Sequence, residues 1–302
     1  MDALGVDIGG TKIAGARVAV DGQVMAHTTR PTTPDNPEGI LDALEEIFQE
    51  LGGADSLPAV GVAVAAFLNQ SRDTIYFSPN IAWRDFPLKQ RVSERLGVPV
   101  VLENDANAAG WGEFRFGAGS DVSSMLMLTL GTGVGGALVD NGRLLVGGFG
   151  MAGELGHIII EPGGRLCGCG NHGCLEQYAS GTALMRDARE SLGEPSLTQA
   201  QLTELLMQQN PVALEALDGV ARALGRGITS LVAVTDPERI VIGGGVAAAG
   251  DLLMQPVRES FLESYGASSK RPVADLALAT MGNTAGVVGA ADLARAQSAL
   301  QA

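Results

Sequence analysis

Two stretches of sequence decide the fold, and the first is LGVDIGGTKIAGARVAVDG at residues 4–22. Its first part, Leu4–Asp7, predicts a short buried strand that runs into Gly9-Gly10-Thr11. Ala14–Val20 predicts a second strand, and Asp21-Gly22 is a typical tight-turn pair after it. The stretch therefore predicts a strand, a glycine loop and a return strand.

The same order of elements recurs in SMLMLTLGTGVGGALVDNG at residues 124–142. Ser124–Leu130 predicts the strand, Gly131-Thr132-Gly133 forms the loop, Val134–Val139 predicts the return strand, and Asp140-Asn141-Gly142 supplies the turn. A unit that occurs twice in this way indicates a weak internal duplication.

The rest of the chain alternates predicted helices and strands, so the fold class is α/β. Asn36-Pro37 is typical of a helix start, and apolar residues at helical spacing follow until Gly52. The other predicted strands are Ala59–Val64, Val98–Leu102 and Arg239–Ile242, and the other predicted helices are Leu88–Leu96, Ser196–Gln209, Pro211–Val234 and Asn283–Ala299.

Composition narrows the function classes. The 302 residues suffice for two domains, and 46% of them are hydrophobic, which indicates a globular chain. The formal net charge of −14 repels phosphate backbones, so we expect no nucleic-acid partner. The N-terminus lacks the pattern of a secretion signal, and the best apolar run, Val62–Leu68, is too short to span a bilayer. We expect a cytoplasmic protein with no membrane partner.

The glycine loops invite comparison with known phosphate-binding motifs. Gly131, Gly133 and Gly136 fit the spacing G-x-G-x-x-G, but a hairpin rather than a helix is predicted after them, which excludes a dinucleotide-binding fold. The G-x-x-x-x-G-K-[ST] pattern of P-loop proteins is also absent from the sequence. Both loops are either ordinary tight hairpins or phosphate sites, in which Thr11 and Thr132 add hydroxyl donors to the backbone N–H groups.

Two carboxylates follow predicted strands. Asp7 stands just before the first glycine loop, where it could hold Mg²⁺ through water. Asp105 ends the segment Glu103-Asn104-Asp105 and begins an alanine-rich helix, so we expect it to be the helix N-cap. A carboxylate at such a strand end can also accept a proton from an attacking hydroxyl group, as phosphoryl transfer requires.

All three cysteines of the chain lie in one short segment, CGCGNHGC at residues 167–174. Three thiolates and one imidazole form the ligand set of a closed, structural zinc site, which leaves no open position for chemistry. His157 is the favoured fourth ligand, His172 is its rival, and three reduced cysteines without metal are the simpler alternative. The expected metal ligands are His157, Cys167, Cys169 and Cys174.

Polar side chains beside these motifs are of the kind that hold sugar hydroxyl groups. The Asn104 amide has both donor and acceptor atoms. Glu154 and Glu176 flank the cysteine segment. They are either solvated surface carboxylates or, if zinc orders the loop, inward-facing acceptors.

Together these segments resemble the ROK family of bacterial sugar kinases, within the actin-like ATPase superfamily, over nearly the whole chain. The resemblance implies two RNase H-like domains with an interdomain active-site cleft: a small domain at 1–115 plus 285–302, and a large domain at 116–284 that carries the zinc loop. The matching segments are Asp7-Ile-Gly-Gly-Thr-Lys12, Glu103-Asn-Asp105, Leu130-Gly-Thr-Gly-Val-Gly-Gly136, Gly153-Glu-Leu-Gly-His157, Cys167-Gly-Cys-Gly-Asn-His-Gly-Cys174 and Leu175-Glu-Gln-Tyr-Ala-Ser-Gly181.

The resemblance also implies roles for single residues. Asp105 matches the catalytic base, and the four expected metal ligands match the family's zinc ligands. The implied sugar contacts are Asn104, Asp105, Glu154, His157 and Glu176. The implied nucleotide contacts are Gly9, Gly10, Thr11, Lys12, Gly131, Thr132 and Gly133 on the phosphate side and Gly243, Gly244 and Gly245 on the nucleoside side.

Two further segments refine the resemblance. Phe77-Ser-Pro-Asn-Ile-Ala-Trp83 and the segment around Glu176 look most similar to the glucokinase branch, which makes Asn80 a further sugar contact. The family's usual Pro-Gly pair is replaced here by Ala65-Ala66, which affects a glycine backbone contact to the sugar.

The resemblance implies ATP- and Mg²⁺-dependent phosphorylation of a hexose, most simply glucose at its 6-hydroxyl, by a homodimer or homotetramer. N-acetylglucosamine, N-acetylmannosamine, mannose and fructose are alternative substrates, and polyphosphate is an alternative donor. Other classes are a non-enzymatic sugar sensor, which the acidic charge disfavours, and an actin-like filament or chaperone ATPase, which the cysteine segment disfavours.

Overall fold

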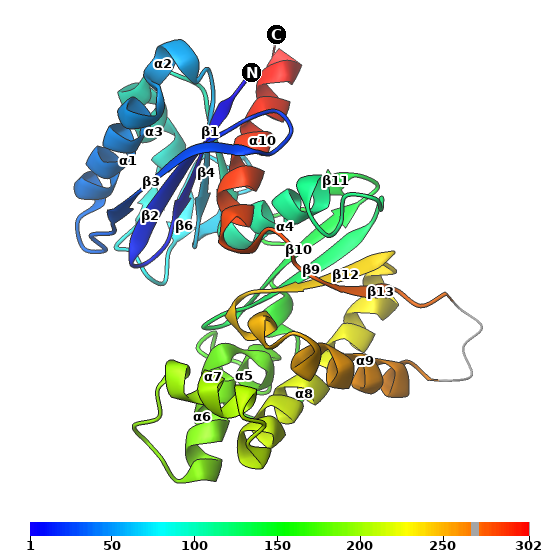
Figure 1. Ribbon diagram of the computed structural model, residues 1–302. Helices are drawn as coiled ribbons and strands as arrows, with labels where there is room; N and C mark the ends of the chain where they lie inside the picture. Colours follow the sequence, from blue (N-terminus) through cyan, green and yellow to red (C-terminus); the bar gives the residue numbers. More distant parts are fainter. Residues whose placement is uncertain (267–271, 302) are drawn as a thin grey trace. The chain divides into compact units, whose positions relative to one another are not determined.

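The computed structural model describes residues 1–266 and 272–301 (Figure 1). Contacts within the chain define two compact units: Met1–Asp121, Ala137–Gly153 and Thr280–Ala302 form the first, and Val122–Gly136 and Glu154–Ala279 form the second. The domain boundaries expected from the sequence are 1–115 plus 285–302 and 116–284. They stay a prediction, because a compact unit need not fold on its own.

A five-stranded sheet forms the centre of the first unit, in the order β3-β2-β1-β4-β8 (Figure 1). The β1–β2 and β2–β3 pairs are antiparallel, whereas β1–β4 and β4–β8 are parallel. Every residue of β4 is buried, which is typical of a parallel strand covered on both faces. The bounds are β1 Ala3–Ile8, β2 Lys12–Val18, β3 Val24–Pro31, β4 Val60–Val64 and β8 Val100–Asn104.

Helices cover both faces of this sheet. Apolar residues of α1 (Pro37–Leu51) and α3 (Leu88–Leu96) share a core cluster with β1 and β4. On the other face, α10 (Ala285–Gln301) approaches the strands closely, because a Cβ atom on Gly5 would lie 1.7 Å from the Val287 carbonyl oxygen. Glycine at this strand position therefore lets α10 lie directly on the sheet.

The second five-stranded sheet follows the order β11-β10-β9-β12-β13. In both sheets the first strand is central, its two successors lie on one side and the last two strands lie on the other. This shared order confirms the internal duplication that the sequence indicates. The bounds are β9 Met125–Leu130, β10 Val134–Asp140, β11 Arg143–Leu144, β12 Arg239–Gly243 and β13 Asp275–Leu278.

The remaining elements include several that the sequence patterns missed. The helices expected at 196–209 and 211–234 are confirmed as α7 (Gln199–Met207) and α8 (Pro211–Thr235). Among the described residues, no helix combines the length and apolar character needed to cross a bilayer. The missed elements are β3, β13, the three-stranded sheet β5 (Phe67–Leu68), β6 (Ile75–Phe77) and β7 (Arg84–Phe86), and the helices α2 (Gly53–Ser56), α5 (Glu176–Ala179), α6 (Gly181–Leu192) and α9 (Asp251–Tyr265).

Candidate active site

Asp105 lies at the elbow between β8 and α4 (Asp105–Phe116). The expectation that Asp105 is the N-cap is wrong. Asn104 has the extended backbone of a cap, with φ −64° and ψ 146°, and its side chain accepts a hydrogen bond from the Asn107 backbone N–H at 3.1 Å. Asp105 is instead the first helical residue, so its carboxylate is not used for capping.

The surroundings of Asp105 make its carboxyl group a weaker acid than an exposed aspartate. Burial raises the pKa of Asp105 above its usual value, although hydrogen bonds from the Ala106 backbone oppose the shift. A carboxyl group with a raised pKa holds a proton more tightly than an exposed one. Asp105 is therefore suited to accept a proton from a bound hydroxyl group.

Asp7, near the end of β1, is the second carboxylate of this region. Burial, together with the negative charge of Asp105, raises the pKa of Asp7 to about 6, and Lys12 opposes the shift. A Cβ atom on Gly286, in the first turn of α10, would lie 3.1 Å from the Asp7 Oδ2 atom. The positive end of that helix also stabilises a nearby anion. Two carboxylates that repel one another are suited to hold a divalent cation, directly or through water.

The first glycine loop lies against Asn80. The Gly9 N–H donates to the Lys12 carbonyl at 3.0 Å and so closes the loop. A Cβ atom on Gly10 would come within 3.2 Å of the Asn80 Cβ atom. The loop expected to contact phosphate and the asparagine expected to contact sugar therefore lie side by side, with little more room than a glycine needs.

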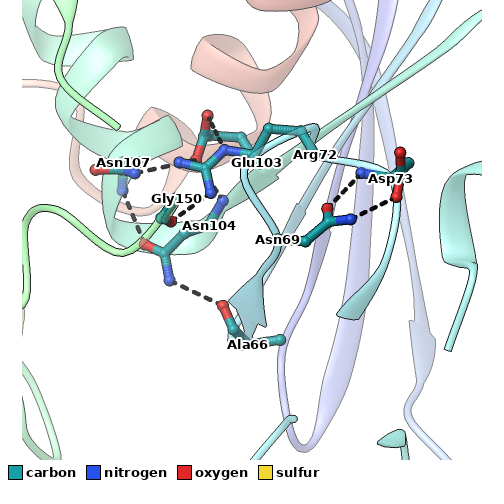
Figure 2. A network of polar contacts seen from close by, with 8 residues as sticks. All are labelled: Ala66, Asn69, Arg72, Asp73, Glu103, Asn104, Asn107 and Gly150. Carbon is teal, nitrogen blue, oxygen red and sulfur yellow. Dashed lines mark hydrogen bonds and ion pairs between the residues drawn. The ribbon is translucent and has the colours of Figure 1, made fainter. Parts of the chain in front are cut away.

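The Ala65-Ala66 segment, where the sequence departs from the family pattern, lies beside the same elbow. The Asn104 side-chain N–H donates to the Ala66 carbonyl at 3.5 Å (Figure 2). The Ala65 carbonyl accepts a hydrogen bond from the Ser78 hydroxyl at 3.0 Å. The backbone of this segment is thus joined by side chains to the elbow and to the segment that carries Asn80.

In the second unit, the start of α6 supports the other glycine loop. The Gly181 N–H donates to the Gly131 carbonyl at 2.8 Å, and the Thr182 hydroxyl donates to the Thr132 carbonyl at 2.7 Å. A Cβ atom on Gly133 would lie 2.7 Å from a carboxylate oxygen of Glu176. Glycine at 133 therefore lets the loop and Glu176 approach closely.

Glu154, His157 and Glu176 also lie together in this unit. The His157 Nε2 atom lies 3.9 Å from a Glu154 carboxylate oxygen, and its Nδ1 atom lies 3.9 Å from a Glu176 carboxylate oxygen. The three side chains therefore form one polar cluster that can hold hydroxyl groups. The carboxylates are acceptors, and the imidazole can donate from its Nε2 atom when Nδ1 binds a metal.

The four expected metal ligands converge on one point. The ligand atoms of His157, Cys167, Cys169 and Cys174 all lie within 4.8 Å of one another. The Cys169 and Cys174 Sγ atoms are 3.6 Å apart, and a zinc–sulfur bond of about 2.3 Å places sulfur ligands of a tetrahedron about 3.8 Å apart. The cluster therefore fits zinc.

Burial also affects the acidity of the thiols in this cluster. Burial raises the pKa of the Cys167 thiol to about 12. Such a thiol ionises at neutral pH when a bound cation replaces its proton. His172 lies outside this cluster, with its Nδ1 atom 2.9 Å from the Gly164 carbonyl oxygen.

A cavity of about 600 Å³ within the second unit was missed by the sequence patterns. It adjoins the Gly131-Thr132 loop and Gly245, which the resemblance links to the nucleotide. Its walls come from α6 and α7, and the helical pattern of α7 gave no sign that one side of the helix faces a cavity. The lining includes Leu184, Met185, Gln199, Leu202, Thr203, Leu206, Met207, Val246 and Leu252.

The candidate residues thus form two sets, one in each unit. The first unit holds the Asp7–Lys12 segment, Asn80, Asn104 and Asp105, and the second holds the Gly131–Gly133 loop, the zinc cluster and the Glu154–His157–Glu176 cluster. Of the third glycine segment, Gly243–Gly245, only Gly245 lines the cavity. Gly244 has a positive φ of 86° and lies against the Leu130 backbone, where a Cβ atom would come within 2.6 Å.

The known proteins that are similar to this chain include glucokinases. The glucokinase of Streptomyces coelicolor is 42% identical, over 97% of each chain. A ROK family glucokinase from Streptomyces griseus, solved in complex with glucose and AMPPNP, is 40% identical with a TM-score of 0.87, over 98% of this chain and 100% of that one. The N-acetylmannosamine kinase of Escherichia coli SMS-3-5 is 33% identical over 98% of this chain and 99% of its own.

The fold agrees with these relatives. The two sheets of equal strand order confirm the expected α/β class, and the likeness to solved ROK glucokinases confirms the actin-like ATPase fold. The sequence pattern of the ROK family matches residues 3–297. Since this match covers nearly the whole chain, the protein belongs to the ROK family.

Proposed function

We propose that this protein is an ATP-dependent hexose kinase that transfers the γ-phosphoryl group of ATP to the 6-hydroxyl of glucose. The observation that carries the proposal is the glucokinase identity of its relatives, one of them solved with glucose and AMPPNP, together with a half-buried carboxylate of raised pKa at Asp105. A kinase needs a positioned base near the sugar and donors around the transferred phosphoryl group.

In this proposal Asp105 is the general base. Its carboxylate accepts the proton of the sugar hydroxyl as that oxygen attacks phosphorus, and the leaving group is ADP. The raised pKa means that the Asp105 carboxylate binds a proton more strongly than an exposed aspartate does, which favours proton transfer in the transition state. Asn104, Asn80 and the Glu154–His157–Glu176 cluster hold the other hydroxyl groups.

The two glycine loops would hold the phosphates through backbone N–H groups, with hydroxyl donors from Thr11 and Thr132 and the charge of Lys12. Asp7 would hold the Mg²⁺ that accompanies ATP, which neutralises phosphate charge when bound. The cavity lined by α6 and α7 has the size and apolar walls that a nucleoside requires.

Zinc has a structural role in the proposal. Its four protein ligands leave no open position for a substrate, so it serves to order the segment that leads into Glu176. We also propose a cytoplasmic location and a homodimer or homotetramer, without a nucleic-acid or membrane partner.

A coupled assay that links ADP formation to NADH oxidation tests the proposal with a panel of sugars. We expect glucose to give the highest kcat/KM with ATP. Since an N-acetylmannosamine kinase is also a relative, that sugar is the second candidate, and N-acetylglucosamine, mannose and fructose complete the panel. Product formation from polyphosphate, measured directly as sugar phosphate, tests the alternative donor. Nucleotide hydrolysis that does not depend on sugar would contradict the proposal.

A further inference from the structure

A turn in the first unit holds an arginine in an unfavourable backbone conformation. Arg72 has a φ of +53°, in the left-handed region that costs a non-glycine residue energy. The turn is fixed by Asn69, whose side-chain oxygen accepts hydrogen bonds from the Asp73 and Thr74 backbone N–H groups at 3.0 and 3.2 Å. Backbone strain of this kind persists only where the surrounding structure enforces it. The contacts of the Arg72 side chain show what enforces it here.

The Arg72 side chain lies within the protein and forms an ion pair with Glu103 (Figure 2). The Nε atom donates to Glu103 Oε2 at 3.2 Å, and Nη2 lies 3.0 Å from Oε1. The exposed fractions of the two side chains are 12% and 7%. This is a nearly buried ion pair with one hydrogen bond, from Nε; the buried Nη2 atom lies close to the carboxylate without a hydrogen bond to it.

Glu103 joins the pair to the elbow that carries Asp105. Its Oε1 atom accepts hydrogen bonds from the Asn104 backbone N–H at 2.9 Å and the Asn107 side-chain N–H at 3.0 Å. Asn104 in turn caps α4 and donates to the Ala66 carbonyl (Figure 2). The Glu103 carboxylate therefore holds both the cap residue and the first turn of the helix that begins with Asp105.

Arg72 joins the same pair to a distant segment of the chain. Its Nη1 atom donates to the Gly150 carbonyl at 2.6 Å (Figure 2). Gly150 has a positive φ of 80°, and a Cβ atom there would lie 2.8 Å from the Asn69 carbonyl oxygen. The segment at 147–153, which leads directly into Glu154, thus packs on the turn that carries Arg72.

We propose that Arg72 and Glu103 are positioning residues, which fix the Asn104-Asp105 elbow and the segment at 147–153 relative to one another. Neither residue is required to touch substrate. This inference rests on the proposed function, because it assigns the pair an effect on the kinase reaction. A buried ion pair is weak evidence for a purely stabilising role, since its desolvation cost offsets much of its attraction.

Four variants separate positioning from stability. Arg72→Met leaves the buried Glu103 carboxylate without its partner, and Glu103→Gln leaves the Arg72 charge unpaired, so each single variant should lower the melting temperature. The double variant Arg72→Met/Glu103→Gln contains neither charge, so it should recover most of the lost melting temperature. Arg115→Met is the matched control, because it removes an arginine from another nearly buried carboxylate, Asp292, and lies on the same helix as Asp105.

The kinetic readout is kcat and sugar KM at saturating ATP, beside the Kd for ATP. A misplacement of about 1 Å at reacting groups can cost on the order of 100-fold in rate, so we expect kcat/KM for the sugar to fall about tenfold or more in Arg72→Met and in the double variant. The Kd for ATP should stay unchanged, and Arg115→Met should keep the kinetic constants of the native chain. A double variant that regains native kcat/KM along with its melting temperature would overturn the inference.

Hydrogen exchange supplies a readout that does not depend on activity. The backbone N–H groups of Asn107 and Ala152 donate to Asn104 and Val146, one at the elbow and one in the 147–153 segment. Both should exchange faster in Arg72→Met and not in Arg115→Met. Unchanged exchange at both sites would refute the inference even if the protein is a kinase. If the native chain phosphorylates no sugar, the proposed function fails, and faster exchange would still support the positioning of the two segments.

Discussion

Replacing Asp7 with asparagine should stabilise the protein above pH 6. Burial and the Asp105 charge raise the pKa of Asp7 from 3.8 to about 6, so the folded state binds its proton more tightly than the unfolded state does. Between these two values the folded protein carries more protons than the unfolded one. Its free energy of unfolding therefore falls as the pH rises through this window.

The size of the effect follows from the shift. One pKa unit corresponds to about 1.36 kcal/mol, so ionised Asp7 costs about 3 kcal/mol above pH 6. This is an upper value, because the positive end of α10 stabilises the ionised carboxylate. Asparagine has the same shape and no charge, so Asp7→Asn removes the cost. For a chain of 302 residues, about 3 kcal/mol corresponds to about 5 °C in melting temperature.

The assay is thermal unfolding of the native chain and of Asp7→Asn, without nucleotide or divalent cation, at intervals from pH 4 to pH 8. We expect similar melting temperatures at pH 4 and a gap that opens through pH 6. Asp55→Asn, at an exposed position, is the control and should show little difference at any pH. The reasoning is refuted if Asp7→Asn is less stable than the native chain at pH 7.5, or if the gap is the same at every pH.

Three further changes test the rest of the site. Asp105→Asn should lower kcat by about 10² to 10⁴ in the coupled assay without lowering the melting temperature, because Asn104 and not Asp105 caps the helix. Cys169→Ser should reduce zinc content, measured by atomic absorption, and lower the melting temperature, whereas full metal loading in this variant would contradict the ligand set. Gly10→Ala should raise the sugar KM, since its methyl group would press on Asn80 at 3.2 Å, and an unchanged KM would argue against that contact.

Repetition and periodicity made much of the fold predictable. The repeated strand–loop–strand unit indicated an internal duplication, which the two sheets of equal strand order confirm, and Asn36-Pro37 with Gly52 marked both ends of α1. Most of the missed strands lack a clear sequence pattern, for one of two reasons. β5, β6 and β7 contain only two or three residues each, too few to show alternation, and much of β3 is exposed, so it lacks an apolar pattern.

Site residues were predictable from the sequence where the residue types of a motif indicate their chemistry. They were not predictable where contacts between distant parts of the chain determine their role. Three cysteines and a histidine predict a zinc site from ligand type alone, and the structure brings their ligand atoms together. The cap at the elbow was assigned one residue too late, because Asn104 and Asp105 are both good capping residues and only the backbone distinguishes them. The Arg72–Glu103 pair gave no sequence signal, since its members are far apart in the chain.

Several departures from ordinary folding rules lie near this elbow. Asp7 and Asp105 have raised pKa values, Arg72 has a positive φ, and the Arg72–Glu103 pair is nearly buried. Each feature costs stability or gains little, and all of them lie in the first unit. Selection for stability alone would favour neutral groups and relaxed backbone at these positions. Their proximity to Asp105 supports the proposal that this elbow is the catalytic part of the first unit.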